Sequence, residues 1–317
     1  MSDVLQEGRV VSVNVSADTG TVKRAVPTIV IDEQGIQNDA HAGPGHRQVS
    51  LLSQERIDAF AKEIGRAIRP GEFAENVTTQ NVDLGRVALL DRLRVGAAEL
   101  EVTQIGKPCH GEGCAIFREV GRCVMPKEGI FCRVIDGGPV HPGDAVRHVA
   151  RPLRFLVITV SDRASRGQYE DRSGPEVQRC IEEHFKGKRW HVEIETDVLP
   201  DDAAKLQQRL ERARDAGIDV IFTTGGTGVG PRDVTPDVVT TIADKLIPGI
   251  MEHIRVKYGA DYPNALLSRG VAAVADETLV YALPGGVKAV GEYMSEILRT
   301  VEHAIAMLHG LGHASAD

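Results

Sequence analysis

The chain has 317 residues, 42% of them hydrophobic and 4% aromatic, and its formal net charge at pH 7 is −8. This length predicts about two domains, and the scarcity of aromatic side chains argues against a surface that stacks single-stranded nucleic acid. Residues 1–150 carry 17 basic and 20 acidic side chains (net −3), and residues 151–317 carry 20 and 25 (net −5). Neither half has the basic excess that binding to a nucleic-acid backbone requires, so nucleic acid is not expected as a partner.

The opening residues and the cysteine content favour a cytoplasmic location. The opening stretch lacks the basic and apolar regions of a signal peptide. No apolar run reaches the roughly 18 residues that a membrane-spanning helix needs. Five cysteines, an odd number in a long chain, fit reduced thiols better than a disulfide framework. We therefore expect a cytoplasmic chain that makes no contact with membranes.

Residues 1–150 have the pattern of short strands separated by turns. Alternating or apolar stretches occur at residues 8–16, 21–32 and 87–105, with glycine and aspartate between them. Such spacing predicts an all-β barrel or sandwich. One helix is expected at residues 53–68, with Ser53 as its N-cap. The proline- and glycine-rich stretch at residues 137–155 places the domain boundary near Ala150.

Residues 151–317 alternate apolar strands with helices. The strands are expected at residues 153–161, 219–226 and 278–286, and the helices at 173–185, 201–216, 236–258 and 287–308. This alternation predicts an α/β domain of three layers, with helices on both faces of a mostly parallel sheet. Ligands of such sheets bind beyond the carboxyl ends of the strands.

A glycine-rich segment, TTGGTGVGPRDVTPD, follows the second of these strands and occupies residues 223–237. Glycine lets a ligand approach the backbone, so this turn would present amide groups to an anion. Thr235 and Pro236 have the order of an N-cap and first helical residue. The spacing fits neither the phosphate-binding P-loop nor the dinucleotide fingerprint. Asp233 and Asp237 would repel a bound phosphate unless a divalent cation such as Mg²⁺ stood between them.

This segment resembles the signature of the MogA/MoaB family of molybdenum-cofactor biosynthesis proteins. The stretches SDRASRGQYEDRSGP, LPDD, LLSRG and LPGGVKAV resemble the other blocks of the family, in the same order. The resemblance covers nearly all of residues 151–317 and implies an α/β fold. It also implies Mg²⁺-dependent transfer of adenylate from ATP to molybdopterin, giving adenylylated molybdopterin and pyrophosphate.

The resemblance assigns roles to residues at the ends of the three strands. Asp201 and Asp233 would be the catalytic aspartates, acting through Mg²⁺, although Asp201 can also be read as a helix cap. Ser268 and Arg269 would hold the pterin or its phosphate. The phosphates of the nucleotide, and the rest of the binding site, would be held by Thr224, Gly225, Gly226, Thr227, Gly228, Ser161, Asp162, Pro284 and Gly285. Gly286 departs from the family, which often has serine or asparagine there, so a side-chain contact with the ligand is lost.

The proposed reaction needs no general base, because the terminal phosphate of molybdopterin is already anionic at neutral pH. The protein must instead align two polyanions and neutralise charge at the α-phosphorus. The alternative is a non-catalytic molybdopterin-binding or carrier protein, since MoaB-type relatives share much of the signature. The resemblance further implies a homotrimer or larger homo-oligomer, and a MoeA-type molybdate insertase is a possible partner.

Residues 8–148 resemble the MOSC domain, a β-rich barrel found in molybdenum-cofactor sulfurases. The resemblance rests on HAGPGHRQVSLLSQE, PGEFAENVTT and EVTQIGKPCHGEGC. Cys109 takes the position of the MOSC cysteine that handles sulfur or reacts with substrate. Its pKa would be lowered by a basic side chain nearby, for which the candidates are His41, Arg47, Lys107 and His110. An unreactive thiol in a binding pocket is the alternative. With no desulfurase domain attached, this domain is expected to bind the pterin cofactor or a late intermediate.

The remaining cysteines leave a second alternative open. Cys109, His110, Cys114 and Cys123 would supply four zinc ligands, although the Cys-x4-Cys spacing lies outside the tightest zinc motifs. Cys123 has the pattern of a strand residue. Cys132 and Cys180 have apolar or helical surroundings and are expected in the core.

Overall fold

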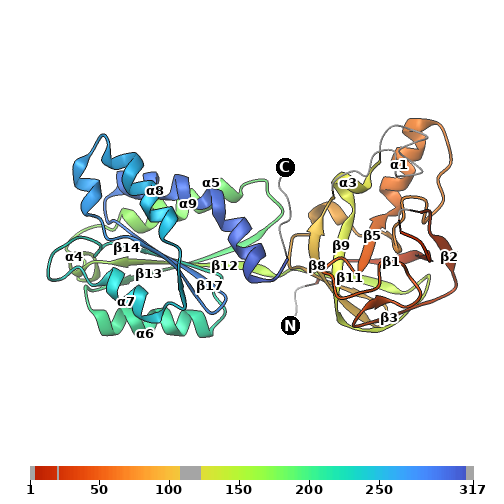
Figure 1. Cartoon of the computed structure of the whole chain (residues 1–317), viewed down its shortest axis with the longest axis horizontal. Helices are drawn as coiled ribbons and strands as arrows, with labels where there is room; N and C mark the ends of the chain where they lie inside the picture. Colours follow the sequence, from red (N-terminus) through yellow and green to blue (C-terminus); the bar gives the residue numbers. More distant parts are fainter. Residues whose placement is uncertain (1–3, 20, 108–122, 312–317) are drawn as a thin grey trace. The chain divides into compact units, whose positions relative to one another are not determined.

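The computed structural model describes residues 4–19, 21–107 and 123–311. The chain divides into two compact units, each described here by itself (Figure 1). The first unit consists of residues 1–151 together with 189–191, and the second of residues 152–188 and 192–317. Within the described part of the chain, no helix combines the length and apolar character needed to cross a membrane.

The first unit is a closed barrel, which decides between the two predicted all-β folds. Its main sheet has the order β11-β7-β8-β9-β5-β6-β1-β2, and β1 also pairs with β11. The barrel closes because β1 is long enough for one end to pair with β11 and the other with β6. A second sheet has the order β10-β3-β4. The strands are β1 (Val4–Val15), β2 (Arg24–Val26), β3 (Ile29–Asp32), β4 (Gly35–Ile36), β5 (Val49–Ser53), β6 (Val77–Gln80), β7 (Arg92–Val95), β8 (Ala98–Ile105), β9 (Ile130–Asp136), β10 (Gly138–Val140) and β11 (Ala145–Val149).

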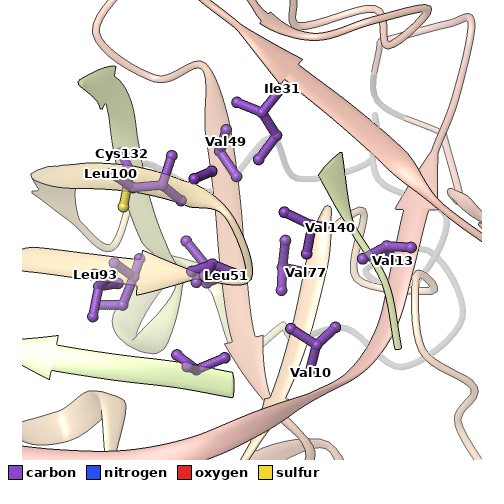
Figure 2. Packing of buried hydrophobic residues seen from close by; sticks show 14 of the residues in the cluster. Val10, Val13, Ile31, Val49, Leu51, Val77, Leu93, Leu100, Cys132 and Val140 are labelled. Carbon is purple, nitrogen blue, oxygen red and sulfur yellow. The ribbon is translucent and has the colours of Figure 1, made fainter. Parts of the chain in front are cut away.

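Branched aliphatic side chains fill the interior of the barrel (Figure 2). Val10 and Val13 from β1 and Val49 and Leu51 from β5 belong to this cluster, and all four are at most 1% exposed. Cys132 belongs to the same cluster, as expected, and burial raises the pKa of its thiol. This thiol therefore serves as a core side chain.

The helix predicted at residues 53–68 is shorter than expected. Helix α1 spans Gln54–Ile64, and Ser53 caps it by accepting a hydrogen bond from the backbone N–H of Arg56 (3.3 Å). Gly65 ends the helix in the left-handed conformation (φ 71°), which glycine adopts at no steric cost. The other helical segments of this unit are η1 (Leu84–Arg86) and α3 (Met125–Glu128).

The second unit has a single sheet of order β13-β12-β14-β17-β16-β15. Strands β12, β14 and β17 are parallel neighbours, whereas β16 runs antiparallel to β17, and β15 antiparallel to β16. The centre of the sheet is thus parallel and one edge is antiparallel. The strands are β12 (Pro152–Val160), β13 (His191–Leu199), β14 (Val220–Thr224), β15 (Lys245–Leu246), β16 (Val271–Ala275) and β17 (Thr278–Leu283).

Helices lie on both faces of this sheet. Figure 1 shows α5, α8 and α9 on one face and α6 and α7 on the other. The helix expected at residues 236–258 is two helices, because the chain between them pairs as β15 with β16 and Pro248 starts a new helix. The helical segments are α4 (Asp162–Ser165), α5 (Ser173–Phe185), α6 (Ala203–Asp215), α7 (Thr235–Ile242), α8 (Pro248–Gly259), η3 (Pro263–Leu267) and α9 (Val287–Leu308).

A buried carboxylate, Asp91, is the polar centre of the first unit. Its oxygens accept hydrogen bonds from the backbone N–H groups of Ala88 (2.7 Å) and Arg151 (2.9 Å). They also contact the Nε2 atoms of His148 (2.6 Å) and His191 (3.0 Å). In the described part of the chain, only these three side chains bring three potential metal-ligand atoms within 4.8 Å of one another. We tested whether they suit a metal.

Hydrogen bonds account for this group better than a metal does. The Gln6 amide is oriented by the backbone of Asp83, which donates to Gln6 Oε1 (2.8 Å) and accepts from Gln6 Nε2 (3.2 Å). Gln6 Nε2 also lies 3.1 Å from His148 Nδ1, which must therefore accept. The proton of the neutral imidazole is then on Nε2, where it is donated to Asp91 and leaves no lone pair for a metal.

We predict that Asp91→Asn lowers the free energy of unfolding by about 3 kcal/mol, because it breaks a buried, fully bonded charge cluster. Burial raises the pKa of Asp91, but the bonds from His148, Arg151 and Ala88 outweigh burial and hold it below its usual range. The stabilisation is therefore present above the unfolded pKa of about 3.9 and is lost as the pH falls below it. Urea denaturation of both proteins between pH 3 and pH 7 measures this difference. Destabilisation of the unmutated chain by EDTA would instead favour a metal.

Candidate functional site

Three loops meet at one edge of the second sheet because their strands end level with one another. The register pairs Thr159 of β12 with Thr224 of β14, and Thr224 with Leu283 of β17. The loops that follow are cross-linked: Gly225 N donates to the carbonyl of Leu283 (3.0 Å), and Thr224 Oγ1 donates to that of Pro284 (2.9 Å). Ser161, Gly225 and Pro284, predicted as site residues, thus lie side by side at the carboxyl ends of parallel strands.

The loop after β14 requires glycine for steric reasons. Gly225 has a φ of 104°, and a β-carbon there would lie 2.3 Å from the carbonyl oxygen of Val160. Gly226 has a φ of 63°, and its β-carbon would lie 2.6 Å from Thr235 Oγ1. Both positions combine a left-handed backbone with close packing, so neither tolerates another residue without displacement of the loop.

The same loop carries four backbone amides that donate to nothing else. Within the described part of the chain, the N–H groups of Gly226, Thr227, Gly228 and Val229 make no hydrogen bond. The next amide, that of Gly230, is occupied by Asp233 Oδ2 (2.8 Å). Consecutive free N–H groups in a turn form a concave donor surface for an anion such as phosphate. This is the strongest sign of ligand binding in the second unit.

Thr235 fastens the loop to α7 and does not act as its N-cap, so that prediction is wrong. Thr235 is the first residue of the helix, and the preceding Val234 makes no side-chain cap. Thr235 Oγ1 donates to the carbonyl of Gly225 (2.9 Å), and the Thr235 N–H donates to the carbonyl of Gly226 (3.2 Å). The hydroxyl therefore turns back toward the glycines and fixes the path of the loop.

Two of the predicted acidic residues are paired across neighbouring loops. Asp162 N donates to Asp201 Oδ2 (3.1 Å), and Asp201 N donates to Asp162 Oδ1 (3.2 Å). The cap of α6 is Asp202, whose Oδ1 accepts from Lys205 N (3.1 Å), so the alternative reading of Asp201 as the cap does not hold. Burial raises the pKa of Asp201, and the nearby negative charge of Asp233 raises it further. A cation beside these carboxylates would be stabilised.

The cation beside them is Arg232, which was not assigned from the sequence. Its Nη2 atom bonds to Asp162 Oδ2 and lies 3.8 Å from Asp201 Oδ2. Arg166 Nη2 also approaches Asp162 Oδ2, at 3.6 Å. The signal for Arg232 was its place directly before Asp233 in the glycine-rich segment. Its partners, however, lie in other loops.

Arg269, predicted to bind the pterin or its phosphate, is occupied by the glycine-rich loop. Its N–H donates to the Thr227 carbonyl and its Nε to the Gly228 carbonyl, both at 2.8 Å. Nη2 donates to the backbone carbonyl of Asp233, and Nη1 lies 3.0 Å from Asp237 Oδ1. These contacts make it a positioning residue for the loop. They also explain Asp237 as the partner of Arg269.

Ser268 is fixed by a hydrogen bond, whereas Gly286 has open space around it. Ser268 Oγ accepts a hydrogen bond from the hydroxyl of Tyr293 (2.9 Å), which fixes its orientation. Gly286 precedes α9 with an ordinary backbone conformation, and a β-carbon there would meet no atom within 4 Å. The side chain that relatives carry at this position would therefore fit without displacing the chain.

The first unit holds a buried ion pair near the end of β8. Lys23 Nζ bonds to Asp39 Oδ2, and both side chains are at most 1% exposed. Burial lowers the pKa of Lys23, and the like charge of Lys107 lowers it further. His41, which is 40% exposed, contacts Asp39 Oδ1 through its Nδ1 atom (3.2 Å). Sequence reasoning did not assign Lys23 or Asp39, because nothing local marks a lysine that will be buried.

The predicted cysteine site lies largely outside the described residues. Cys109, His110 and Cys114 fall in residues 108–122, so neither the reactive thiol nor the zinc set can be placed. Cys123 is half-buried and precedes α3, so its prediction as a strand residue is wrong. Cys180 is half-buried in α5 beside Glu176, and burial raises the pKa of its thiol.

We predict that Gly225→Ala lowers the free energy of unfolding by at least about 2 kcal/mol, because the loop must move away from Val160. The same movement should abolish binding of an anion such as phosphate to the amides of residues 226–229. Gly286→Ala adds the same methyl group in open space and is the matched control, with an expected change below about 0.5 kcal/mol. Chemical denaturation of the two variants checks the difference. Equal destabilisation would contradict the close packing at Gly225.

Comparison with known proteins places both halves of the chain. Residues 156–303 match the family described as "Probable molybdopterin binding domain", and residues 37–147 match the MOSC domain. Molybdopterin adenylyltransferase of Haemophilus influenzae is 38% identical over 146 residues, which cover 46% of this chain and 73% of that protein. Gephyrin of Dictyostelium discoideum is 37% identical over 159 residues, or 48% of this chain, but the match spans only 22% of gephyrin.

A solved structure described as "anomalous substructure of MogA" aligns with a TM-score of 0.45 and 34% identity over 50% of this chain and 99% of that chain. The molybdopterin adenylyltransferase match covers most of that relative at more than 30% identity. The chain therefore belongs, through its second half, to the MogA/MoaB family of molybdenum-cofactor biosynthesis proteins, and its first half is a MOSC domain.

Proposed function

We propose that the second half of the chain transfers adenylate from ATP to molybdopterin. The observation that carries this proposal is the row of free amides at residues 226–229 beside the paired carboxylates of Asp162 and Asp201. An anion-binding loop next to an acidic pair suits a metal-bound nucleotide better than an uncomplexed anion, which the carboxylates would repel. The names of the relatives support the same reaction.

The reaction balances without a proton acceptor. A phosphate oxygen of molybdopterin attacks the α-phosphorus of ATP, a new P–O bond forms, and the bond to the β-phosphate oxygen breaks. Pyrophosphate leaves with the electron pair of that bond. The chain's task is to bind both polyanions in line and to stabilise charge at the α-phosphorus, which the free amides of residues 226–229 can do.

The residues at this edge suit Mg²⁺. Asp162, Asp201 and Asp233 offer carboxylate oxygens, the ligand type that Mg²⁺ prefers, and phosphate oxygens of the nucleotide would supply the remaining ligands. Burial raises the pKa of Asp201, and the negative charge of Asp233, which a cation would offset, raises it further. Asp233 uses one oxygen to hold Gly230. When bound, Mg²⁺ would neutralise the nucleotide phosphates, and Asp201 and Asp233 would hold it.

The test is the release of pyrophosphate by the full chain supplied with ATP, Mg²⁺ and molybdopterin. Asp201→Asn removes charge without volume and should lower kcat by about 100-fold or more. Asp202→Asn, one residue further, keeps a good helix cap and should leave kcat within about twofold. Tight binding of molybdopterin without pyrophosphate would instead identify a carrier protein. Equal loss of activity in both variants would contradict a special role for Asp201.

For the MOSC domain we propose binding of the pterin cofactor, or handling of sulfur through Cys109. Lys107, close enough to Lys23 to lower its pKa, places positive charge at the start of the segment that contains Cys109. Positive charge favours the reactive thiolate. The two domains in one chain would then act on the same cofactor, in a homo-oligomer and beside a MoeA-type insertase.

We predict that Cys109 is alkylated fastest of the five cysteines at pH 7, and that Cys132 is alkylated slowest. Cys132 is fully buried and burial raises the pKa of its thiol, as burial also does for Cys180. Peptide mapping after limited reaction with iodoacetamide ranks the thiols. A slow Cys109 would remove the physical basis of sulfur handling. Protection of Cys109, Cys114 and Cys123 that a chelator relieves would favour zinc.

A further inference from the structure

Arg232 neutralises a pair of carboxylates whose positions do not depend on it. Asp162 and Asp201 are joined by reciprocal bonds from backbone N–H groups (3.1 and 3.2 Å). Arg232 reaches them from a third loop, bonding to Asp162 and lying 3.8 Å from Asp201 Oδ2. The carboxylates are thus held by the backbone, whereas the guanidinium, among the described residues, contacts these carboxylates alone.

The contact between Arg232 and Asp162 is easily broken. The Arg232 side chain is 66% exposed, and the turn that carries it, residues 229–232, is exposed throughout. Exposed ion pairs contribute little to stability, because water competes for both groups and the long side chain loses rotamer freedom. Arg232 can therefore leave Asp162 without disturbing the fold.

A second partner for Arg232 would bind on the same turn. The free amides of residues 226–229 end three residues before Arg232, and they suit an anion. A guanidinium group can bind two phosphate oxygens at once through two parallel hydrogen bonds. A phosphate is therefore at least as good a partner for Arg232 as the carboxylates of Asp162 and Asp201. A phosphate at these amides would compete with Asp162 for the arginine.

We propose that Arg232 changes partners when the nucleotide binds. In the ligand-free chain it neutralises Asp162 and Asp201. In the loaded chain it binds a phosphate of the nucleotide, and Asp162 and Asp201 are released to join Asp233 in binding a divalent cation. The inference rests on the proposed function and deepens it. Its consequence is that cation and nucleotide bind well only together, because a cation alone must displace Arg232 while the arginine gains no phosphate.

Two binding measurements on the full chain test this exchange. Mn²⁺ alone is the first probe, followed by electron paramagnetic resonance. Arg232→Gln should tighten Mn²⁺ binding about threefold to fivefold, because only the more distant guanidinium of Arg166, 3.6 Å from Asp162 Oδ2, then competes for that carboxylate. The second probe is the Mg²⁺ complex of α,β-methylene-ATP, measured by calorimetry. The same variant should bind it about tenfold more weakly, because a charged contact to phosphate is lost.

The opposite signs separate partner exchange from a merely structural role, which would weaken both ligands. Arg163→Gln is the matched control: it removes the same charge one residue after Asp162, where the guanidinium lies over the Tyr169 ring (5.4 Å). It should leave Mn²⁺ binding unchanged. Arg232→Lys keeps the charge and should hold Mn²⁺ affinity near that of the unmutated chain.

Two results would overturn the proposal. If Arg232→Gln leaves Mn²⁺ binding unchanged or weakens it while the unmutated chain still releases pyrophosphate, partner exchange is wrong and the proposed activity stands. If the unmutated chain binds molybdopterin but neither Mn²⁺ nor the ATP analogue, separately or together, both the exchange and adenylyl transfer are wrong.

Discussion

The close approach of Gly225 to Val160 is the constraint on which the candidate site depends. A β-carbon at Gly225 would stand 2.3 Å from the Val160 carbonyl oxygen, so the loop after β14 can pass the end of β12 only because glycine has no side chain. Gly285 lies beside Gly225, since a β-carbon at Gly285 would make ordinary contact with the Gly225 α-carbon at 3.4 Å. The three loops therefore end at the same edge of the sheet, and the amides of residues 226–229 find no partner among the residues that the structure describes.

The same edge of the sheet carries an excess of acidic groups that the fold tolerates. Asp162 and Asp201 are placed by each other's backbone, and Asp233 by the turn at Gly230. None of these arrangements removes the like-charge repulsion. Burial raises the pKa of Asp201, and the negative charge of Asp233 raises it further. Two arginines lie beside these acidic groups, and their partners differ. Arg269 is bound by backbone carbonyls and holds the loop, whereas Arg232 is bound by carboxylates and is free to move.

The first unit contains charged side chains that are buried. Asp91 accepts hydrogen bonds on both oxygens, and Lys23 is paired with Asp39, so no charge of either group is left uncompensated. Removing one partner from such a group lowers the stability of the fold more than replacing both partners by apolar side chains, because one buried polar group is then left unsatisfied.

The sequence by itself determined the features that depend on neighbouring residues. Ser53 caps α1, and α5 and α9 span the predicted residues, because capping groups, proline and apolar periodicity act within a few positions. The need for glycine before α7 was likewise visible in the segment itself. The family resemblance supplied the acidic residues, because it compares whole motifs.

Only the tertiary structure decided the features that depend on distant partners. The predicted helix at residues 236–258 is divided because β15 pairs with β16, a contact that no local pattern encodes. Asp202, not Asp201, caps α6, and this leaves Asp201 to face Asp162 across 39 positions of sequence. Arg232 and Arg269 lie near the same glycine-rich loop, yet Arg232 bonds to carboxylates of other loops, whereas Arg269 bonds to carbonyls of the loop itself and to Asp237. Long side chains choose among partners that folding brings together, so their roles follow from packing and not from sequence position.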